Sequence, residues 1–477
     1  MLDATAPIAK DPARQQLDAA LDAHFASGAF EQSLARRVAW RTESDLGTAP
    51  AALADYLREE IALTFAPMGF SCTLHDNPDP RGGPFLVARR IEDPRLPTLL
   101  TYAHGDVVNG QEGRWQDGLS PWTLTRVDQR WYGRGTADNK GQHSISLAAL
   151  EQAITARQGR LGYNVTVLME TGEEAGSPGL HAFCTQQREQ LRADLLIACD
   201  GPRVSAERPT LFLGSRGAVN FTLRVRARDR AFHSGNWGGV LVNPATVLAQ
   251  AWASMVDRHG RIRVPALRPA QVPADVRDVL AGLPVGGAPD DPTLDAHWGE
   301  PGLTPIERLV AWNTLELLAM ESGSPARPIN AIPSSAVMHA QLRFVVGTPW
   351  RDLASIVRAH LDAEGMQQVE VEVVASAAAS RTPVSDPWVG WAAQSMARST
   401  GKSIAILPNL AGTLPNDVFS DILGLPTLWV PHSYPACAQH APNEHLLVDV
   451  AREGLQIMGG LFWDLGNTDA APWPVRA

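Results

Sequence analysis

The sequence predicts an α/β fold, in which a largely parallel sheet flanked by helices is interrupted by a smaller α+β domain. In the first part of the chain, apolar β-branched runs alternate with helical periodicity, as in strand–helix–strand units. After about Pro209 the pattern changes to the strict alternation of antiparallel strands, and after about residue 378 it changes back. We therefore expect one domain built from residues 1–209 and 379–477, with a second domain inserted at 210–378.

The first domain begins with helical periodicity between Pro12 and Phe70, most clearly in A-A-L-A-D-Y-L-R-E-E-I-A-L. Strands and helices are then predicted to alternate, which is typical of parallel pairing. They are a strand at 84–90, a strand at 96–103, a helix at 144–157, a strand beginning at 165, a helix near 181–191 and a strand at 193–199.

The inserted segment contains two predicted strand–helix–strand units, which suggests a ferredoxin-like α+β domain. Its predicted elements are a strand region at 211–227, a helix at 243–258, a Pro-, Gly- and Asp-rich stretch at 261–328 with a helical patch around 307–320, a strand at 335–346, a helix at 350–364 and a strand at 369–374. The chain then returns to the first domain with a helix at 387–400 and strands near 404–407 and 427–430.

Composition excludes several classes of function. The 477 residues include 41 Lys and Arg against 51 Asp and Glu, so the net charge of −10 argues against a nucleic-acid partner. No stretch approaches the ~18 uninterrupted apolar residues that suggest a membrane span, and the start of the chain lacks the apolar core of a signal peptide. The four cysteines are scattered, which favours a reducing cytoplasm over a disulfide framework.

Several polar residues stand directly after predicted strands. His104 follows the strand at 96–103, the neighbours Glu173 and Glu174 follow the strand beginning at 165, and Asp200 follows the strand at 193–199. In parallel sheets, ligands bind beyond the carboxyl ends of the strands. We therefore expect these side chains to meet at one edge of the sheet.

Each candidate also has an ordinary structural explanation when it is taken alone. An H-x-D pair such as His104 and Asp106 is usually incidental, and adjacent glutamates usually form a solvated acidic turn. Asp138 is well placed to cap a helix, Asp200 to form an Asx turn, and His440 to lie on the surface of a loop. The occurrence of all of them at strand ends or glycine turns is much harder to explain in this way.

Five motifs together resemble the M20 metallopeptidases, which are dinuclear zinc amidohydrolases. They are A-H-G-D-V-V, Y-G-R-G-T-A-D-N-K-G, E-T-G-E-E-A-G-S, the strand-terminal Asp200, and H-A-P-N-E near the end of the chain. Their order and spacing match across essentially the whole sequence. The length and the inserted domain look most like the carnosinase-type dipeptidase branch, so the resemblance implies a zinc-peptidase-like catalytic domain and a lid or dimerisation domain.

The resemblance also implies two Zn²⁺ ions per subunit. Asp138 would bridge both ions, His104 and Asp200 would complete one site, and Glu174 and His440 the other. These nitrogen and oxygen ligands suit zinc and also accept Mn²⁺ or Co²⁺.

Further roles follow from the same resemblance. Glu173 matches the general base that activates a metal-bridging water, and Asp106 matches the residue that orients His104. His233 in F-H-S-G and Asn330 in N-A-I-P match positions that act across a homodimer. The residues matching the substrate-binding positions are Arg343, Gly412 and Thr413.

The predicted function is metal-dependent hydrolysis of an amide bond in a dipeptide or an N-acyl amino acid. Two alternatives stay open: a deacylase that acts on an acylated amino-acid-like metabolite, and a non-catalytic metal-binding member of the family. Gln439 and Ala411 depart from the glycines that the family usually carries at these positions. Both lie near the expected substrate site, so they bear on substrate identity more than on catalysis.

Overall fold

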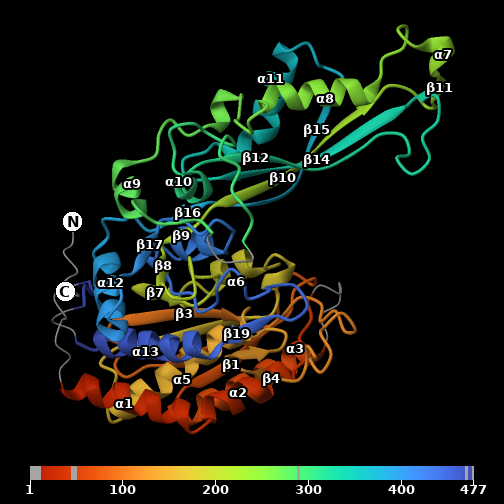
Figure 1. The fold of residues 1–477 in the computed structure, drawn as a ribbon. Helices are drawn as coiled ribbons and strands as arrows, with labels where there is room; N and C mark the ends of the chain where they lie inside the picture. The colour runs from red at the N-terminus through yellow and green to blue at the C-terminus, as the bar shows by residue number, and fades with distance from the viewer. Residues whose placement is uncertain (1–11, 45–50, 287–290, 468–470, 475–477) are drawn as a thin grey trace.

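The computed structural model describes residues 12–44, 51–286, 291–467 and 471–474. Two sheets dominate the molecule: a broad one covered by helices, and a narrow one that extends away from it as an arm (Figure 1). The broad sheet is mainly parallel and the arm is antiparallel, which confirms the predicted fold class. Within these described ranges, no helix combines the length and apolar character that crossing a bilayer requires.

The broad sheet has eight strands, and its central strands are buried on both faces. β3 reads T-L-L-T-Y-A-H and β6 reads N-V-T-V-L-M-E, and every residue of both is buried, as expected for parallel strands between helical layers. β3 pairs in parallel with β6 and β7, and β18 pairs in parallel with β7. In spatial order the strands are β1 (Ser71–His75), β2 (Phe85–Arg90), β6 (Asn164–Glu170), β3 (Thr98–His104), β7 (Leu195–Ala198), β18 (Thr427–Trp429), β8 (Thr210–Phe212) and β17 (Ala405–Leu407).

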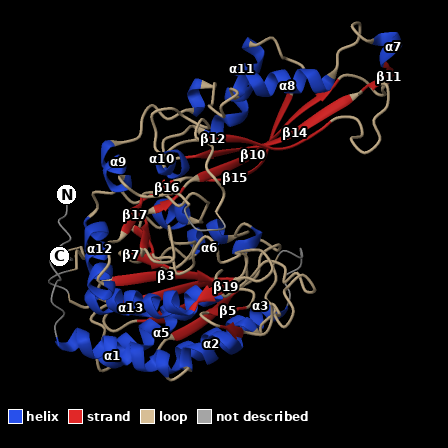
Figure 2. Cartoon of the chain, viewed as in Figure 1, coloured by secondary structure: helices blue, strands red, loops and turns tan. Residues whose placement is uncertain are grey.

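Helices cover both faces of this sheet (Figure 2). The two hydrophobic cores, one on each face, are built from apolar residues of the strands and of the helices facing them. One face carries α1 (Pro12–Ala26), α2 (Ala29–Val38), α5 (Lys140–Ala156), α12 (Pro387–Thr400) and α13 (Val448–Leu465), and the helical segment α3 (Ala51–Asp55), 56–61 and α4 (Ala62–Phe65) packs at its edge. The other face carries α6 (Leu180–Gln186), α9 (Ala274–Leu280) and α10 (Pro305–Val310).

The arm is a four-stranded antiparallel sheet with two helices on one face. The chain passes through strand, helix, strand, strand, helix, strand, and the first strand pairs with the third and the fourth, as in a ferredoxin-like fold. These elements are β10 (Gly217–Arg226), α8 (Pro244–Met255), β12 (Thr314–Glu321), β14 (Ser335–Phe344), α11 (Leu353–Ala363) and β15 (Glu370–Ala377). The far end of the arm carries β11 (Phe232–His233), α7 (Ser234–Trp237) and β13 (Ala331–Ile332) (Figure 1).

Short strands complete the fold. β9 (Gly214–Ser215) pairs with β16 (Ser380–Arg381) where the chain crosses between the two sheets. β8 lies in the broad sheet, so we propose that the inserted domain begins between β8 and β10, a few residues after the predicted boundary at 209/210. A small sheet beside the candidate site contains β4 (Thr125–Val127), β5 (Arg130–Tyr132) and β19 (His445–Leu447).

The predicted helix at 307–320 is wrong over its second half. The structure has α10 as far as Val310, followed by strand β12 from Thr314 to Glu321. The strand reads T-L-E-L-L-A-M-E, in which Leu, Glu, Ala and Met all favour helices. Pairing with β14 overrides this local preference, because the backbone of β12 completes the edge of the arm sheet.

Candidate metal centre

The strand ends of the broad sheet bring the predicted metal ligands together. His104 is the last residue of β3, and Asp200 comes two residues after β7. Glu174 lies in the turn after β6, and Asp138 lies just before α5. The fifth candidate, His440, arrives from the loop before β19, far along the chain. The site therefore lies where parallel sheets bind ligands.

These side chains form two clusters that share one carboxylate. His104, Asp138 and Asp200 make one cluster, and Asp138, Glu174 and His440 make the other, with the ligand atoms of each cluster within 4.8 Å of one another. His104 Nε2 lies 2.9 Å from Asp138 Oδ1, whereas His440 Nε2 lies 3.1 Å from Asp138 Oδ2. Each oxygen of Asp138 therefore faces a different cluster.

Asp106 connects the histidine of one cluster to the turn that carries both glutamates. His104 Nδ1, the ring nitrogen that does not face Asp138, lies 3.1 Å from the backbone carbonyl oxygen of Asp106 and 3.3 Å from its Oδ1. The backbone N–H groups of Glu173 and Glu174 donate to the two oxygens of Asp106 at 3.2 and 3.1 Å. Asp106 is fully buried; it thus contacts His104 through its carbonyl and its carboxylate, and the carboxylate also holds the acidic turn.

The electrostatics of the centre favour bound cations. Burial, together with the negative charge of Asp138, raises the pKa of Glu174 and of Asp200 to about 7. Burial also raises the pKa of Glu173 well above its ordinary range. Within the described part of the chain, Glu174 Oε1 and Asp200 Oδ2 are buried and accept no hydrogen bond. Divalent cations would satisfy these oxygens and offset the repulsion, so the residues fit a metal centre.

The pKa of the histidine next to the shared carboxylate is also raised, but by hydrogen bonds and not by burial. Hydrogen bonds to Asp138 and Glu174 raise the pKa of His440 to about 10. Burial opposes ionisation of Asp138, but contacts with His104 and His440 outweigh it and lower its pKa. His440 is half exposed, so this side of the centre opens to solvent.

Sequence reasoning assigned no role to Glu444, although the residue closes the H-A-P-N-E motif. Its Oε1 accepts the backbone N–H groups of Ala137 at 2.8 Å and of Asp138 at 3.1 Å. Its Oε2 lies 2.6 Å from Arg134 Nη1 in a fully buried ion pair. Its place in the same motif as His440 was the only signal that pointed to it.

Gln439 also contacts the centre directly. Its Nε2 donates a hydrogen bond to Asp138 Oδ2, the same oxygen that faces His440. Gln439 stands where the family usually carries a glycine, and it was expected to lie near the substrate. In the structure its side-chain amide contacts the shared carboxylate of Asp138.

Two of the predicted substrate-binding residues meet where the arm joins the broad sheet. Arg343, on β14, donates from Nη1 to the hydroxyl of Thr413 at 2.9 Å and from Nε to Gln341 at 2.8 Å. Gly412 precedes Thr413 in the same loop, which Arg216 holds by donating to the carbonyl of Ala411 at 3.0 Å. A guanidinium group therefore stands over the A-G-T turn.

The two residues that were predicted to act across a homodimer lie far from this turn. His233 pairs with Ala331 between β11 and β13, and the Ser234 N–H donates to the Asn330 carbonyl at 2.9 Å. Both His233 and Asn330 are exposed, and β11 lies at the far end of the arm from β3 and β6 (Figure 1). Within one chain, the structure does not bring them to the metal cluster.

Known proteins share these sequence features. The family model described as peptidase family M20/M25/M40 matches residues 100–464. A Beta-Ala-His dipeptidase from Rattus norvegicus is 36% identical over 194 residues, which are 40% of this chain and 39% of that protein. A Cysteinylglycine-S-conjugate dipeptidase from Corynebacterium striatum is 32% identical over 251 residues, covering 50% of this chain and 54% of that one. The chain thus matches about two fifths to half of the length of these curated relatives.

Solved structures share the whole fold. Human carnosine dipeptidase 1 superposes with a TM-score of 0.75 and 22% identity, covering 97% of this chain and 100% of that chain. A metallo-carboxypeptidase of the M20 family from Sulfolobus solfataricus gives a TM-score of 0.75 at 22% identity, covering 92% of this chain and 99% of that chain. At this identity the likeness shows the fold, and the family match rests on the sequence. The resemblance seen in the five motifs is confirmed: the chain belongs to peptidase family M20/M25/M40.

Proposed function

We propose that this protein is a metal-dependent hydrolase that cleaves the amide bond of a dipeptide or an N-acyl amino acid. The observation that carries the proposal is the pair of three-residue clusters sharing Asp138, with Glu173 beside them. Relatives that are named as dipeptidases for β-Ala-His and for a cysteinylglycine conjugate support a dipeptide as the substrate.

The proposed cofactor is a pair of Zn²⁺ ions. His104, Asp138 and Asp200 would hold one ion, and Asp138, Glu174 and His440 the other. All five ligands are imidazoles or carboxylates, which suit zinc and also accept Mn²⁺ or Co²⁺. When bound, such ions polarise a carbonyl and lower the pKa of water.

Glu173 is the proposed general base. Its backbone is fixed by Asp106, and its side chain belongs to neither cluster, so its carboxylate is free to exchange a proton. It would take a proton from the attacking water and return it to the leaving amine. Its raised pKa, caused by burial, brings it towards the range where a carboxylate can both accept and donate.

Arg343 and Thr413 are proposed to bind the carboxylate of the substrate. The guanidinium fork suits a planar carboxylate, and it already holds the Thr413 hydroxyl at 2.9 Å. Gly412 would let the backbone of the turn approach the bound substrate closely.

The active unit is proposed to be a homodimer, in which His233 and Asn330 reach the site of a second subunit. Their exposure at the end of the arm supports this arrangement, as do the exposed apolar side chains around them, namely Trp237, Val240, Val242 and Ile329. There His233 would stabilise the oxyanion of the tetrahedral intermediate. We also propose a cytoplasmic location, which four free cysteines support.

The test is a turnover screen of dipeptides and N-acyl amino acids after loading with Zn²⁺, Mn²⁺ or Co²⁺. Hydrolysis of dipeptides would support the proposal. Turnover of N-acyl compounds alone would instead identify a deacylase. Stoichiometric metal binding without turnover of either class would indicate a non-catalytic protein.

A further inference from the structure

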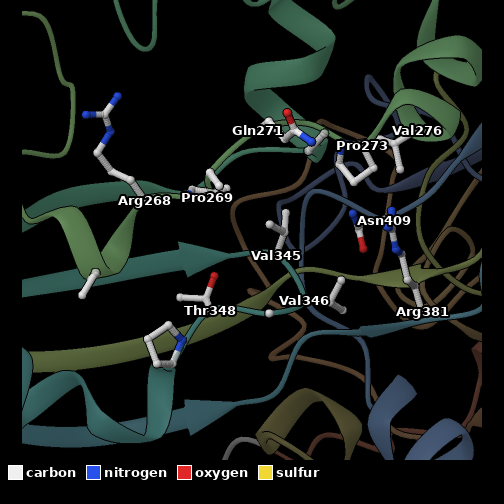
Figure 3. A pocket seen from close by; sticks show the side chains of 15 residues that line it. Arg268, Pro269, Gln271, Pro273, Val276, Val345, Val346, Thr348, Arg381 and Asn409 are labelled. Atoms are coloured by element: carbon white, nitrogen blue, oxygen red, sulfur yellow. The ribbon is translucent and has the colours of Figure 1, made fainter.

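A cavity of about 270 Å³ lies at the junction of the arm and the broad sheet. Its walls come from the segment after β14, the crossing strand β16, the loop after β17 and the segment before α9 (Figure 3). Of the residues that the structure describes, neither the predicted metal ligands nor Arg343 and Thr413 line it. The cavity is therefore separate from the candidate metal centre.

The charge in this cavity is of one sign. Its only charged lining residues among those described are Arg268 and Arg381, and no carboxylate lines it. Arg268 pairs with Glu300 at 2.7 Å, outside the cavity lining. In the described ranges, the guanidinium group of Arg381 makes neither an ion pair nor a side-chain hydrogen bond, although the residue is half-buried. Burial lowers the pKa of Arg381, and the charge of Asp275 opposes this effect without forming an ion pair.

A second polar group lies beside this arginine. Asn409 is only 1% exposed, and its Nδ2 donates to the Val310 carbonyl at 2.8 Å. That bond fixes the orientation of the amide, and its Oδ1 accepts no hydrogen bond from the described residues. The side chains of Arg381 and Asn409 stand next to each other at one end of the cavity (Figure 3). A buried acceptor without a donor costs about 1–3 kcal/mol, and Asn409 Oδ1 is such an acceptor.

Much of the remaining lining is apolar. It includes Val345, Val346, Val276 and Pro273, of which Pro273 and Val276 lie beside Asn409 (Figure 3). A ligand that fits must therefore combine an anionic group for Arg381, a donor for Asn409 and a small apolar body. A planar carboxylate matches the guanidinium fork better than a point charge would.

We propose that this cavity binds a free α-amino acid with an apolar side chain. The carboxylate pairs with Arg381, the ammonium group donates to Asn409 Oδ1, and the side chain packs on Val345 and Val346. The ligand would touch both the arm and the broad sheet, because Val345 follows β14 and Asn409 follows β17. The inference does not depend on the proposed hydrolysis.

Calorimetric titration of the chelator-treated protein with L-leucine tests the proposal. The titrated protein also carries Arg343→Gln. Without metal ions and without Arg343, an amino acid should no longer bind as a product at the metal centre, whereas binding in the cavity should persist. Arg381→Gln is expected to weaken L-leucine binding about ten-fold or more, because a charge-assisted pair is lost. Arg188→Gln removes the same charge from an exposed position outside the cavity and should leave binding unchanged.

A second variant changes the apolar lining. Val346→Trp should fill the cavity and abolish binding while Arg381 stays in place, and thermal unfolding shows whether each variant folds. Isopentylamine, which lacks the carboxylate, should not bind. The proposal is overturned if the parent protein does not bind L-leucine, if Arg381→Gln binds it equally well, or if inorganic phosphate binds more tightly than L-leucine.

Discussion

Glu444 holds the backbone of Asp138 across a sequence separation of 306 residues. One carboxylate oxygen accepts the N–H groups of Ala137 and Asp138, while the other is neutralised by Arg134 in a fully buried pair. Glu444, in the last part of the chain, therefore fixes the position of the shared carboxylate of Asp138. A residue that binds no metal by itself determines where the two clusters meet.

Glu444→Gln should weaken metal binding and lower stability. The amide keeps the acceptor for the two N–H groups but leaves Arg134 buried without a counter-charge, which costs about 3–5 kcal/mol. Loss of the support behind a ligand typically costs about 10–100-fold in metal affinity. Zinc titration calorimetry and urea unfolding measure the two effects. Arg452→Gln, which breaks an exposed ion pair with Asp22, is the matched control. It should change neither the zinc affinity nor the free energy of unfolding. Unchanged zinc affinity in Glu444→Gln would contradict this role.

Substitution of the neighbours Glu173 and Glu174 should have different effects, one on turnover and the other on metal binding. Glu173→Gln is expected to retain both metal ions and lose about 10²–10⁴-fold in kcat, because only the proton carrier is removed. Glu174→Gln should lose metal from the cluster that it shares with His440. Metal content by mass spectrometry alongside kcat separates the two outcomes. Full activity in Glu173→Gln would remove that residue from the mechanism.

Mixing two inactive proteins tests the role of the arm. If His233 acts in a second subunit, His233→Ala and Glu173→Ala homodimers that exchange subunits form mixed dimers with one complete site. Random exchange should then restore about a quarter of the parent activity. His297→Ala, another exposed histidine, should be active by itself. Absence of rescue after subunit exchange has been verified would assign His233 another role.

Glu170 should make stability depend on pH. Burial, with the charge of Asp106, raises its pKa from 4.5 to about 7, and its Oε1 accepts the hydroxyls of Tyr102 at 2.5 Å and Ser177 at 3.0 Å. Below pH 4.5 the group is protonated in both states. As the pH rises from 4.5 to 7, the unfolded chain ionises first, so the native state loses about 3 kcal/mol, and the loss is constant above pH 7.

Glu170→Gln removes this titration and keeps an oxygen acceptor for both hydroxyls. In chelator, the variant should therefore gain up to about 3 kcal/mol relative to the parent protein between pH 5 and pH 8. Urea unfolding at pH 5 and at pH 8 measures this difference in the free energy of unfolding, and Glu364→Gln, at an exposed position, is the control. An equal difference between variant and parent at both pH values would rule out ionisation of Glu170 as the cause.

The positions of His104, Glu174 and Asp200 could be predicted from the residues because each follows a strand, and strands are visible as local patterns. Asp138 and His440 lie before a helix and in a loop, and they were assigned through the family resemblance. His104, Glu174 and Asp200 were predicted to share an edge, and the structure brings them together. The support from Glu444 was not predictable, because hydrogen bonds to backbone groups 306 residues away leave no periodicity. Strand β12 was missed because its residues favour a helix and only pairing with β14 makes it a strand.

The candidate metal ligands lie on both sides of the inserted arm in the sequence, so they are synthesised at different times. β18, His440 and Glu444 all follow the inserted arm in the sequence, yet β18 pairs with β7 in the middle of the broad sheet. A ribosome-bound chain that has emerged only as far as the arm carries the whole of one cluster, His104, Asp138 and Asp200, but lacks His440 of the other. The cluster of Asp138, Glu174 and His440 can therefore assemble only after the segment that follows the arm has been made, and a chain truncated at the arm would lack it.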